Sequence, residues 1–180
     1  MATSSSTPAT ADQPTKNPVS VLFVCLGNIC RSTMAEGVFQ SLTSPSHPLI
    51  ANIDSCGTGA YHVGDSPDSR TLSTLRANGI TNYKHAARKF SPSKDFAAFD
   101  YIFAMDLSNL HDLERLRAKE VRRNGVEEGV GKVMLFGAFG GHVGGREVVQ
   151  DPYYGGDEGF DTAYEQCVRC GKGFLEFLEK

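Results

Sequence analysis

The stretch that decides the fold is Cys25-Leu26-Gly27-Asn28-Ile29-Cys30-Arg31-Ser32. The apolar run Val21–Val24 precedes it, and apolar residues at helical spacing follow it up to Leu42. This order predicts a buried strand, a tight loop and a helix. Because the first backbone N–H groups of a helix have no partner inside the helix, a loop that leads into one is a binding site for an anion.

The residue types within this loop suit a tetrahedral oxyanion. We expect Gly27 and Asn28 to adopt positive φ, so that the curled backbone turns several N–H groups toward one point. Arg31 adds a planar fork that matches two phosphate oxygens. The field that holds the anion also favours a thiolate, so Cys25 is predicted to be a nucleophile beneath it. The pattern indicates phosphoryl transfer to cysteine rather than a packing cysteine beside a surface arginine.

The segment Val24–Ser32 resembles the anion loop of the low-molecular-weight protein tyrosine phosphatase family. The resemblance includes Asp151–Tyr154, Phe103–Leu110 and Gln166–Cys170, and it runs from about Val19 to the C-terminus. It implies an acid phosphatase that hydrolyses phosphotyrosine in proteins, or small aryl phosphates, through a phosphocysteine intermediate. It also implies that the reaction uses no metal and no cofactor.

Roles for further residues come from the same resemblance. Asp151 would be the general acid; an Asp-Pro pair is restricted in conformation, but without the resemblance it indicates only a loop aspartate. Phosphate or substrate binding is expected for Leu26, Gly27, Asn28, Ile29, Cys30, Ser32, Tyr61, Tyr153 and Tyr154. A supporting network that holds the loop and Arg31 is expected to include Ser55, His85 and Asp106.

Other cysteines raise the question of redox chemistry. Cys30 shares the tight loop with Cys25, so we expect the two sulfurs to approach disulfide range and Cys30 to capture an oxidised Cys25. The alternative is that Cys30 only packs beneath the loop. Cys167 and Cys170 have the spacing of half a zinc site, but they lie on an apolar helical stripe and suitable further ligands are lacking, so packing is expected.

Composition limits the partners and the compartment. The chain has 180 residues and a formal net charge of −3, which does not favour nucleic acid or an anionic membrane. Its five cysteines, two of them in the anion loop, suit a reducing compartment, and the cytoplasm is expected. No stretch approaches the length of a membrane span. We expect a monomer or a weak dimer.

The order of elements predicts an α/β fold. Residues 1–17 resemble a disordered tail, and residues 18–180 form the expected phosphatase domain. Expected strands are Val19–Val24, Leu49–Ser55, Tyr101–Met105 and Val133–Phe136, and expected helices include Ser32–Leu42, one opened by Asp65-Ser66-Pro67, and Asp157–Leu178. Strands that alternate with helices form a parallel sheet covered on both faces. The resemblance implies a single three-layer domain whose four strands have the order 2-1-3-4.

Three local features complete the expectations. Thr33 and Glu36 have the spacing of a capping box at the start of the first helix. Relative to the family, residues 117–131 are expected to form an extended segment, and the glycine-rich run Gly137–Gly145 is expected to be flexible just before Asp151. Two other functions stay open: arsenate reduction on the same fold, which needs a relay of further thiols, and non-catalytic phosphate binding.

Overall fold

The computed structural model describes residues 17–141 and 147–180, and within these ranges four strands form one parallel sheet. The strands are β1 (Val19–Cys25), β2 (Ile50–Gly57), β3 (Tyr101–Ala104) and β4 (Lys132–Leu135). Their order is β2-β1-β3-β4, and each adjacent pair is parallel. The expected fold class and strand order are confirmed.

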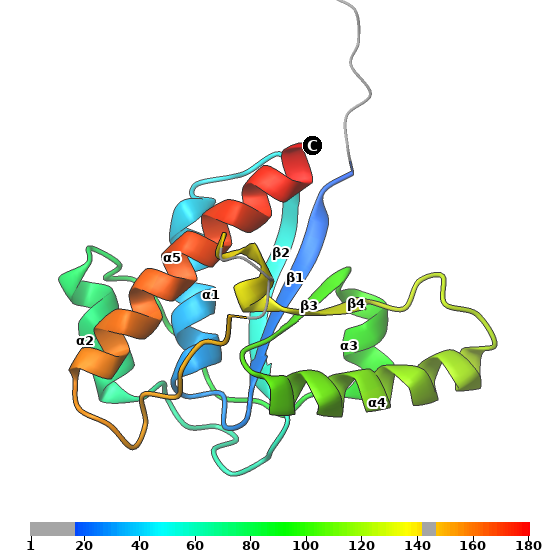
Figure 1. Cartoon of the computed structure of the whole chain (residues 1–180), viewed down its shortest axis with the longest axis horizontal. Coiled ribbons are helices and arrows are strands. Elements are labelled where there is room, and N and C mark those ends of the chain that lie inside the picture. The colour runs from blue at the N-terminus through cyan, green and yellow to red at the C-terminus, as the bar shows by residue number, and fades with distance from the viewer. Residues whose placement is uncertain (1–16, 142–146) are drawn as a thin grey trace, which may run out of the picture.

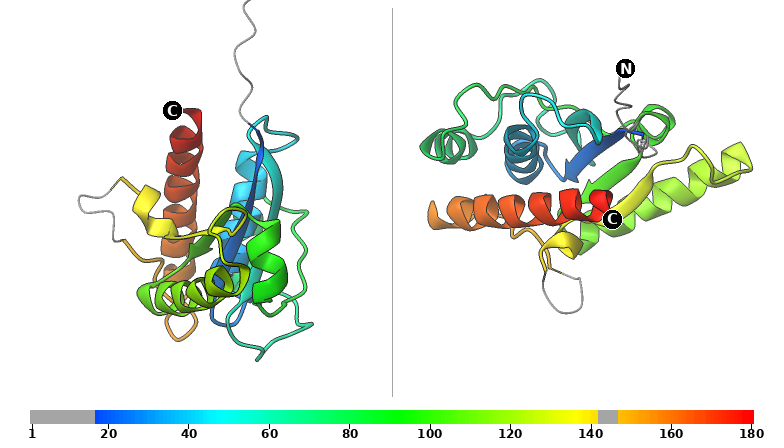
Figure 2. Two further views of the ribbon diagram at one scale, coloured as in Figure 1. Left: turned by 90° about the vertical axis from the view of Figure 1, so that its right-hand side faces the viewer. Right: turned by 90° about the horizontal axis from the view of Figure 1, so that it is seen from above.

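Helices cover both faces of this sheet (Figure 1). One face carries α1 (Arg31–Leu42), α2 (Ser69–Ala77) and α5 (Glu158–Glu179). The other face carries α3 (Pro92–Ala98) and α4 (Leu107–Asn124). Figure 2 shows α5 and α3 on opposite sides of the strands, which is the three-layer arrangement.

The strand that precedes the anion loop lies between two apolar clusters. Successive side chains of a strand point to opposite faces, so a strand buried on both faces is apolar throughout. Phe23 packs in the cluster under α1 and α5, whereas Leu22 and Val24 pack in the cluster under α3 and α4. All three side chains are fully buried. This burial explains the continuous apolar run and fixes the place where the loop begins.

Three chain segments meet at the carboxyl ends of the central strands. The anion loop follows β1, and the backbone N–H of Met105 after β3 donates to Val24 O at 3.2 Å. The N–H of Val149 donates in turn to Met105 O at 2.8 Å, which brings the segment before Asp151 to the same edge. In sheets of this kind the crevice at the reversal of strand order is the usual ligand site.

The second helix begins later than expected. Its cap is Asp68, whose side chain accepts the N–H of Arg70, and not Ser66. The N–H of Asp68 donates to Ile29 O at 2.8 Å, so the chain before the helix is held against the anion loop instead of continuing as a helix. The expected opening of this helix at Asp65-Ser66-Pro67 was wrong, because this tertiary hydrogen bond sets the boundary.

The capping box is also wrong. Thr33 Oγ1 donates to Cys30 O at 2.9 Å, while the Glu36 carboxylate is buried and accepts from Ser55 Oγ at 2.6 Å. Glu36 thus faces the protein interior, and its side chain bonds to Ser55 of β2 and to Gln40 of its own helix instead of to the start of that helix.

The segment 117–131 and the glycine-rich run Gly137–Gly145 differ in part from the expected structure. In the segment 117–131, α4 continues to Asn124, and Gly125 ends it in the left-handed conformation with φ of 76°. The glycine-rich run starts inside a short 3₁₀ helix, Phe136–Phe139, which differs from the expected flexible segment. Residues 142–145 of that run and nearly all of the predicted tail lie outside the described residues.

No helix in the described part of the chain has both the length and the apolar character that crossing a membrane requires.

Candidate active site

The loop between β1 and α1 curls around the sulfur of Cys25. Asn28 has φ of 58°, the only positive φ of a non-glycine residue in the described part of the chain, and its backbone N–H donates to Cys25 Sγ at 3.2 Å. Gly27 does not share this conformation, so that expectation was wrong. A Cβ atom at Gly27 would instead lie 3.1 Å from His62 Cδ2, so a larger residue there would require the His62 ring to shift.

A buried amide holds the loop in this conformation. Asn28 Nδ2 donates to Ser32 Oγ at 3.0 Å and to Ser55 Oγ at 2.9 Å. Its Oδ1 accepts the N–H of Arg88 at 2.9 Å and lies 2.9 Å from His85 Nε2. With both ends of the amide occupied, the left-handed backbone of Asn28 is fixed from several directions.

Glu36 completes the layer beneath Asn28. Its Oε2 accepts from Tyr83 OH at 2.8 Å and lies 3.2 Å from His85 Nδ1. Burial, followed by the charge of Glu36, raises the pKa of the Tyr83 phenol, so this hydroxyl remains a donor. The sequence reasoning missed Glu36 as a support; the available signal was a charged residue on a helix face that is otherwise apolar.

The same layer contains three groups that could ligate a metal. One ligand atom each from Glu36, Asp54 and His85 lie within 4.8 Å of one another. Both His85 nitrogens already face partners, Glu36 on one side and Asn28 on the other. Asp54 accepts from Arg88 Nε at 2.9 Å. We assign no metal here because these atoms serve the hydrogen-bond network.

Arg31 is the buried cation of the site, with a side chain only 5% exposed. It forms an ion pair with Asp106 through Nη1 and another with Asp151 through Nη2, the latter at 3.0 Å. Burial opposes the charge, but the hydrogen bond to Asp106 and the neighbouring negative groups outweigh it and raise the pKa of Arg31. Asp106 also caps α4 by accepting the N–H of Asn109 at 2.8 Å, so the guanidinium is anchored to a helix start.

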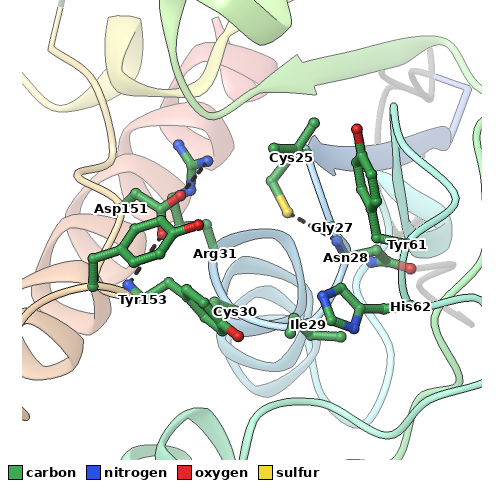
Figure 3. Close-up of a pocket in the computed structure, with 12 residues that line it drawn as sticks. Cys25, Gly27, Asn28, Ile29, Cys30, Arg31, Tyr61, His62, Asp151 and Tyr153 are labelled. Carbon is green, nitrogen blue, oxygen red and sulfur yellow. Dashed lines mark hydrogen bonds and ion pairs between the residues drawn. The ribbon is translucent and has the colours of Figure 1, made fainter.

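Asp151 lies opposite the anion loop on a more exposed segment. Its side chain is 41% exposed, and its Oδ1 accepts the backbone N–H of Tyr153 at 3.1 Å. Figure 3 shows Tyr61 on one side of Cys25, with Asp151 and Tyr153 on the other side. The structure therefore brings the nucleophile candidate, the acid candidate and two aromatic walls into one place.

These side chains enclose a pocket of about 440 Å³. Its floor is the anion loop, and its rim is aromatic and largely exposed: Tyr61 is 77% exposed, Tyr153 40% and Tyr154 92%. Its lining is formed by Cys25, Leu26, Gly27, Asn28, Ile29, Cys30, Arg31, Tyr61, His62, Asp151, Tyr153 and Tyr154. His62 is the lining residue that the sequence reasoning missed, and its only signal was its position beside Tyr61.

The remaining predicted residues lie behind the pocket wall. Ser32 Oγ is 3.1 Å from Cys25 Sγ, which suits a hydroxyl that hydrogen-bonds to the nucleophile. Ser55 and His85 contact Asn28, and Asp106 contacts Arg31, as the resemblance implies. These four residues hold loop groups in place and do not line the pocket.

The five cysteines are all buried and unpaired. Burial, followed by the charge of Asp68, raises the pKa of Cys30 to about 12. Cys167 and Cys170 belong to the apolar cluster beneath α1 and α5, in line with the packing expectation. Of the five, Cys25 is the cysteine whose sulfur accepts the loop N–H of Asn28.

Comparisons with known proteins agree with this geometry. Residues 20–180 match the family described as low molecular weight phosphotyrosine protein phosphatase. A relative of that name from Schizosaccharomyces pombe is 51% identical over 91% of this chain and 99% of its own length, and one from Homo sapiens is 44% identical over 92% and 98%. The crystal structure of a protein tyrosine phosphatase from Entamoeba histolytica superposes with a TM-score of 0.75 at 33% identity, over 89% of this chain and 97% of that one. A Drosophila arginine phosphatase superposes equally well, with a TM-score of 0.75 at 36% identity, over 89% of this chain and 98% of that one. The chain therefore belongs to the low molecular weight phosphotyrosine protein phosphatase family, a family of hydrolases.

Proposed function

We propose that this protein hydrolyses phosphotyrosine in proteins and small aryl phosphates, with Cys25 as nucleophile and Asp151 as general acid. The observation that carries the proposal is the placement of the Cys25 sulfur at the floor of a pocket whose opposite wall holds Asp151. Arg31 lies between them and is the charged group best placed to bind phosphate oxygens.

The first step transfers the phosphoryl group to sulfur. The Cys25 thiolate attacks phosphorus, the bond from phosphorus to the phenolic oxygen breaks, and Asp151 gives its proton to that oxygen. In the second step a water molecule attacks the phosphocysteine while Asp151 takes its proton. The sulfur–phosphorus bond breaks, and the hydroxyl of Ser32, 3.1 Å from Sγ, stabilises the departing thiolate.

Substrate binding must change the contact between Arg31 and Asp151. In the structure Asp151 Oδ2 accepts a hydrogen bond from Arg31 Nη2 at 3.0 Å. A phosphate dianion has more charge than a carboxylate and matches the planar fork with two oxygens, so it would displace Asp151 from that nitrogen. The freed carboxyl group would then face the leaving-group oxygen. The ion pair to Asp106 would keep the guanidinium in place during this exchange.

The aromatic rim supports a flat substrate group. Tyr61 and Tyr153 stand on opposite sides of the pocket, and aromatic walls favour a planar phenol ring between them. One structural neighbour is the Drosophila arginine phosphatase, so phosphoarginine is a second candidate substrate for the same slot. A phosphotyrosine peptide and a phosphoarginine peptide of equal sequence, compared by kcat/KM, would distinguish the two; higher turnover of phosphotyrosine is expected.

Arsenate reduction and simple phosphate binding are the two other functions considered. A thiol relay for arsenate needs mobile, reactive cysteines beyond the first, whereas Cys167 is fully buried and burial raises the pKa of Cys170 to about 12. A module that only binds phosphate has no need of Asp151 opposite the sulfur. These observations favour the phosphatase.

The decisive experiment measures phenyl phosphate and phosphotyrosine peptide hydrolysis with EDTA present, for wild type and Cys25→Ser. Wild type should turn over both substrates, and Cys25→Ser should lose turnover while still binding inorganic phosphate through the loop amides and Arg31. Residual activity above a trace would contradict the nucleophile assignment. Arsenate turnover that depends on added thiol, without phosphatase activity, would instead support the reductase.

We also propose that Cys25 is the oxidation-sensitive thiol of the site. Peroxide would convert its thiolate to a sulfenic acid, and attack by the Cys30 sulfur would form a disulfide and release water. The raised pKa of Cys30 makes this capture slow at neutral pH. A peptide linking Cys25 and Cys30, detected by mass spectrometry after peroxide treatment, would support capture; its absence would leave Cys30 as a packing residue.

Cytoplasmic location and a monomeric or weakly dimeric state are part of the same proposal. Five unpaired cysteines support a reducing compartment. The net charge of −3 supports a partner other than nucleic acid.

A further inference from the structure

Arg70 is a charged residue beside the site to which neither the sequence nor the proposed mechanism gives a role. It lies in the first turn of α2 and is tied to the cap of that helix. Arg70 Nε donates to Asp68 Oδ1 at 3.0 Å and Nη2 donates to Oδ2 at 2.9 Å, which is a bidentate pair. This geometry holds the guanidinium plane in one orientation.

Asp68 links that pair to the anion loop. Its backbone N–H donates to Ile29 O at 2.8 Å, next to Cys30. Its side chain is only 12% exposed, and the hydrogen bond from Arg70 lowers the pKa of its carboxyl group. The fork of Arg70 is therefore built on the same backbone that forms the floor of the pocket.

The other side of Arg70 contacts the segment that carries the acid. Its Nη2 donates to the backbone oxygen of Tyr153 at 3.3 Å, and its Cζ lies 5.7 Å from the centre of the Tyr153 ring. Its Cζ also lies 4.5 Å from the ring centre of Phe160, in the first turns of α5, which is a cation–π distance. Arg70 is thus packed between the acid segment and the helix that follows it.

The backbone of Tyr153 connects Arg70 to the general acid. Its carbonyl oxygen is held by Arg70, and its N–H donates to Asp151 Oδ1 at 3.1 Å. Asp151 is 41% exposed, and within the described part of the chain its one other polar contact is the ion pair with Arg31 that substrate must replace. Once phosphate occupies Arg31, the Tyr153 backbone is the remaining hydrogen-bonded support of the acid.

We propose that Arg70 is a positioning residue for the general acid: it fixes the Tyr153 backbone to the anion loop through Asp68 and so keeps Asp151 above the leaving-group oxygen. The inference rests on the proposed function of Asp151. It assigns to Arg70 no contact with the phosphate, and its effect should follow the demand of the leaving group for a proton.

The test measures kcat and KM of Arg70→Ala on phenyl phosphate, which has a poor leaving group, and on a dinitrophenyl phosphate, which needs no acid. Arg70→Ala should lose about 10- to 100-fold in kcat on phenyl phosphate and less than about 3-fold on the activated ester, because misplacement of a catalytic group is costly only where that group acts. Arg76→Ala is the matched control: it removes an exposed arginine of the same helix and should match wild type.

Two further variants separate positioning from charge and from folding. Arg70→Lys keeps the charge but cannot form the bidentate fork, so it should not restore activity on phenyl phosphate. Arg70→Met keeps an unbranched stem against Phe160 and should show the same loss as Arg70→Ala, with a melting temperature closer to wild type. Rescue by lysine would mean that charge alone matters and would overturn the inference.

A double-mutant cycle distinguishes failure of this inference from failure of the proposed function. If Arg70 acts through the acid, Arg70→Ala should have almost no effect in an Asp151→Asn background. Equal losses on both esters, or losses that add in the double mutant, would overturn the role of Arg70 while Asp151 keeps its own. Absence of any leaving-group dependence in Asp151→Asn would instead overturn the proposed acid.

Discussion

The anion loop and the acid segment form the two halves of one pocket, and they are held in very different ways. In the anion loop Asn28 and Arg31 are buried, and the Asn28 side chain bonds to two serines and to the backbone of Arg88. The acid segment is exposed at Asp151, whose carboxylate reaches the loop through an ion pair to Arg31. A binding site benefits from fixed donors, whereas an acid that must release Arg31 to substrate needs a contact that can be exchanged.

The two halves also differ in how they are anchored to the core. The anion loop continues directly from β1 and into α1. The acid segment is attached before Asp151 by side chains of α5: Gln166 Nε2 donates to Glu147 Oε1 at 2.8 Å and to Val148 O at 3.1 Å. This attachment gives the acid a defined position although the segment belongs to no helix or strand.

The largest effect is expected at the cation that both halves share. Arg31→Lys should lower kcat/KM about 10³-fold or more on every aryl phosphate, since removal of one positioned donor costs about 10²–10³-fold in kcat and phosphate binding weakens as well. Steady-state kinetics on phenyl and dinitrophenyl phosphate measure it. Cys25→Ser with inorganic phosphate is the reference for intact binding. Near-normal KM in Arg31→Lys would contradict the fork.

A smaller and selective effect is expected in the acid half. Asp151→Asn should slow phenyl phosphate at least about 10²-fold, whereas the dinitrophenyl ester should change little, because an activated leaving group needs no proton. The same change removes a carboxylate from Arg31 Nη2, so inorganic phosphate should bind the variant at least as well as wild type. Equal losses on both esters would make Asp151 a structural residue and would require another acid.

The contrast between the halves also explains what the sequence could predict. The anion loop is contiguous, so its chemistry, the strand before it and the helix after it follow from neighbouring residues. Two local predictions, positive φ at Gly27 and the capping box of Thr33 and Glu36, were wrong for the same reason. Within the loop only Asn28 has positive φ, because tertiary hydrogen bonds hold its side-chain amide. Glu36 does not form the capping box because its carboxylate accepts hydrogen bonds from Ser55 and Tyr83 in the interior.

The contacts of the acid half could not be predicted from local sequence patterns. Asp151 contacts Arg31 across 120 positions of sequence, and an Asp-Pro pair carries no signal of that contact; only resemblance to a family identified it. Arg70 has even less signal, because its partners Tyr153 and Phe160 follow it by more than eighty residues. A close approach of distant segments depends on the packing of the sheet and helices, which no local pattern contains.

The smallest effect is expected at Asp68, where the two halves join. The hydrogen bond from Arg70 lowers the pKa of Asp68 below its ordinary value of 3.8, so the folded state favours the carboxylate. The stabilisation of the folded state by ionised Asp68 is therefore complete above the pKa of Asp68 in the unfolded chain, and it is lost as pH falls through the lower pKa in the folded protein. Asp68→Ala should lower the free energy of unfolding at pH 7 by about 0.5–2 kcal/mol through loss of the helix cap.

Asp68→Asn separates the cap from the charge in the same experiment. Asparagine keeps a side-chain oxygen for the N–H of Arg70 but cannot form the charged pair, so its deficit relative to wild type should shrink as pH falls from 5 toward 3. The difference between the alanine and asparagine variants should stay constant over that range. Urea unfolding at each pH gives both quantities. A deficit of Asp68→Asn that stays constant or grows toward low pH would show that the charge of Asp68 does not stabilise the junction, and that the two halves are joined there by the cap and the Ile29 hydrogen bond alone.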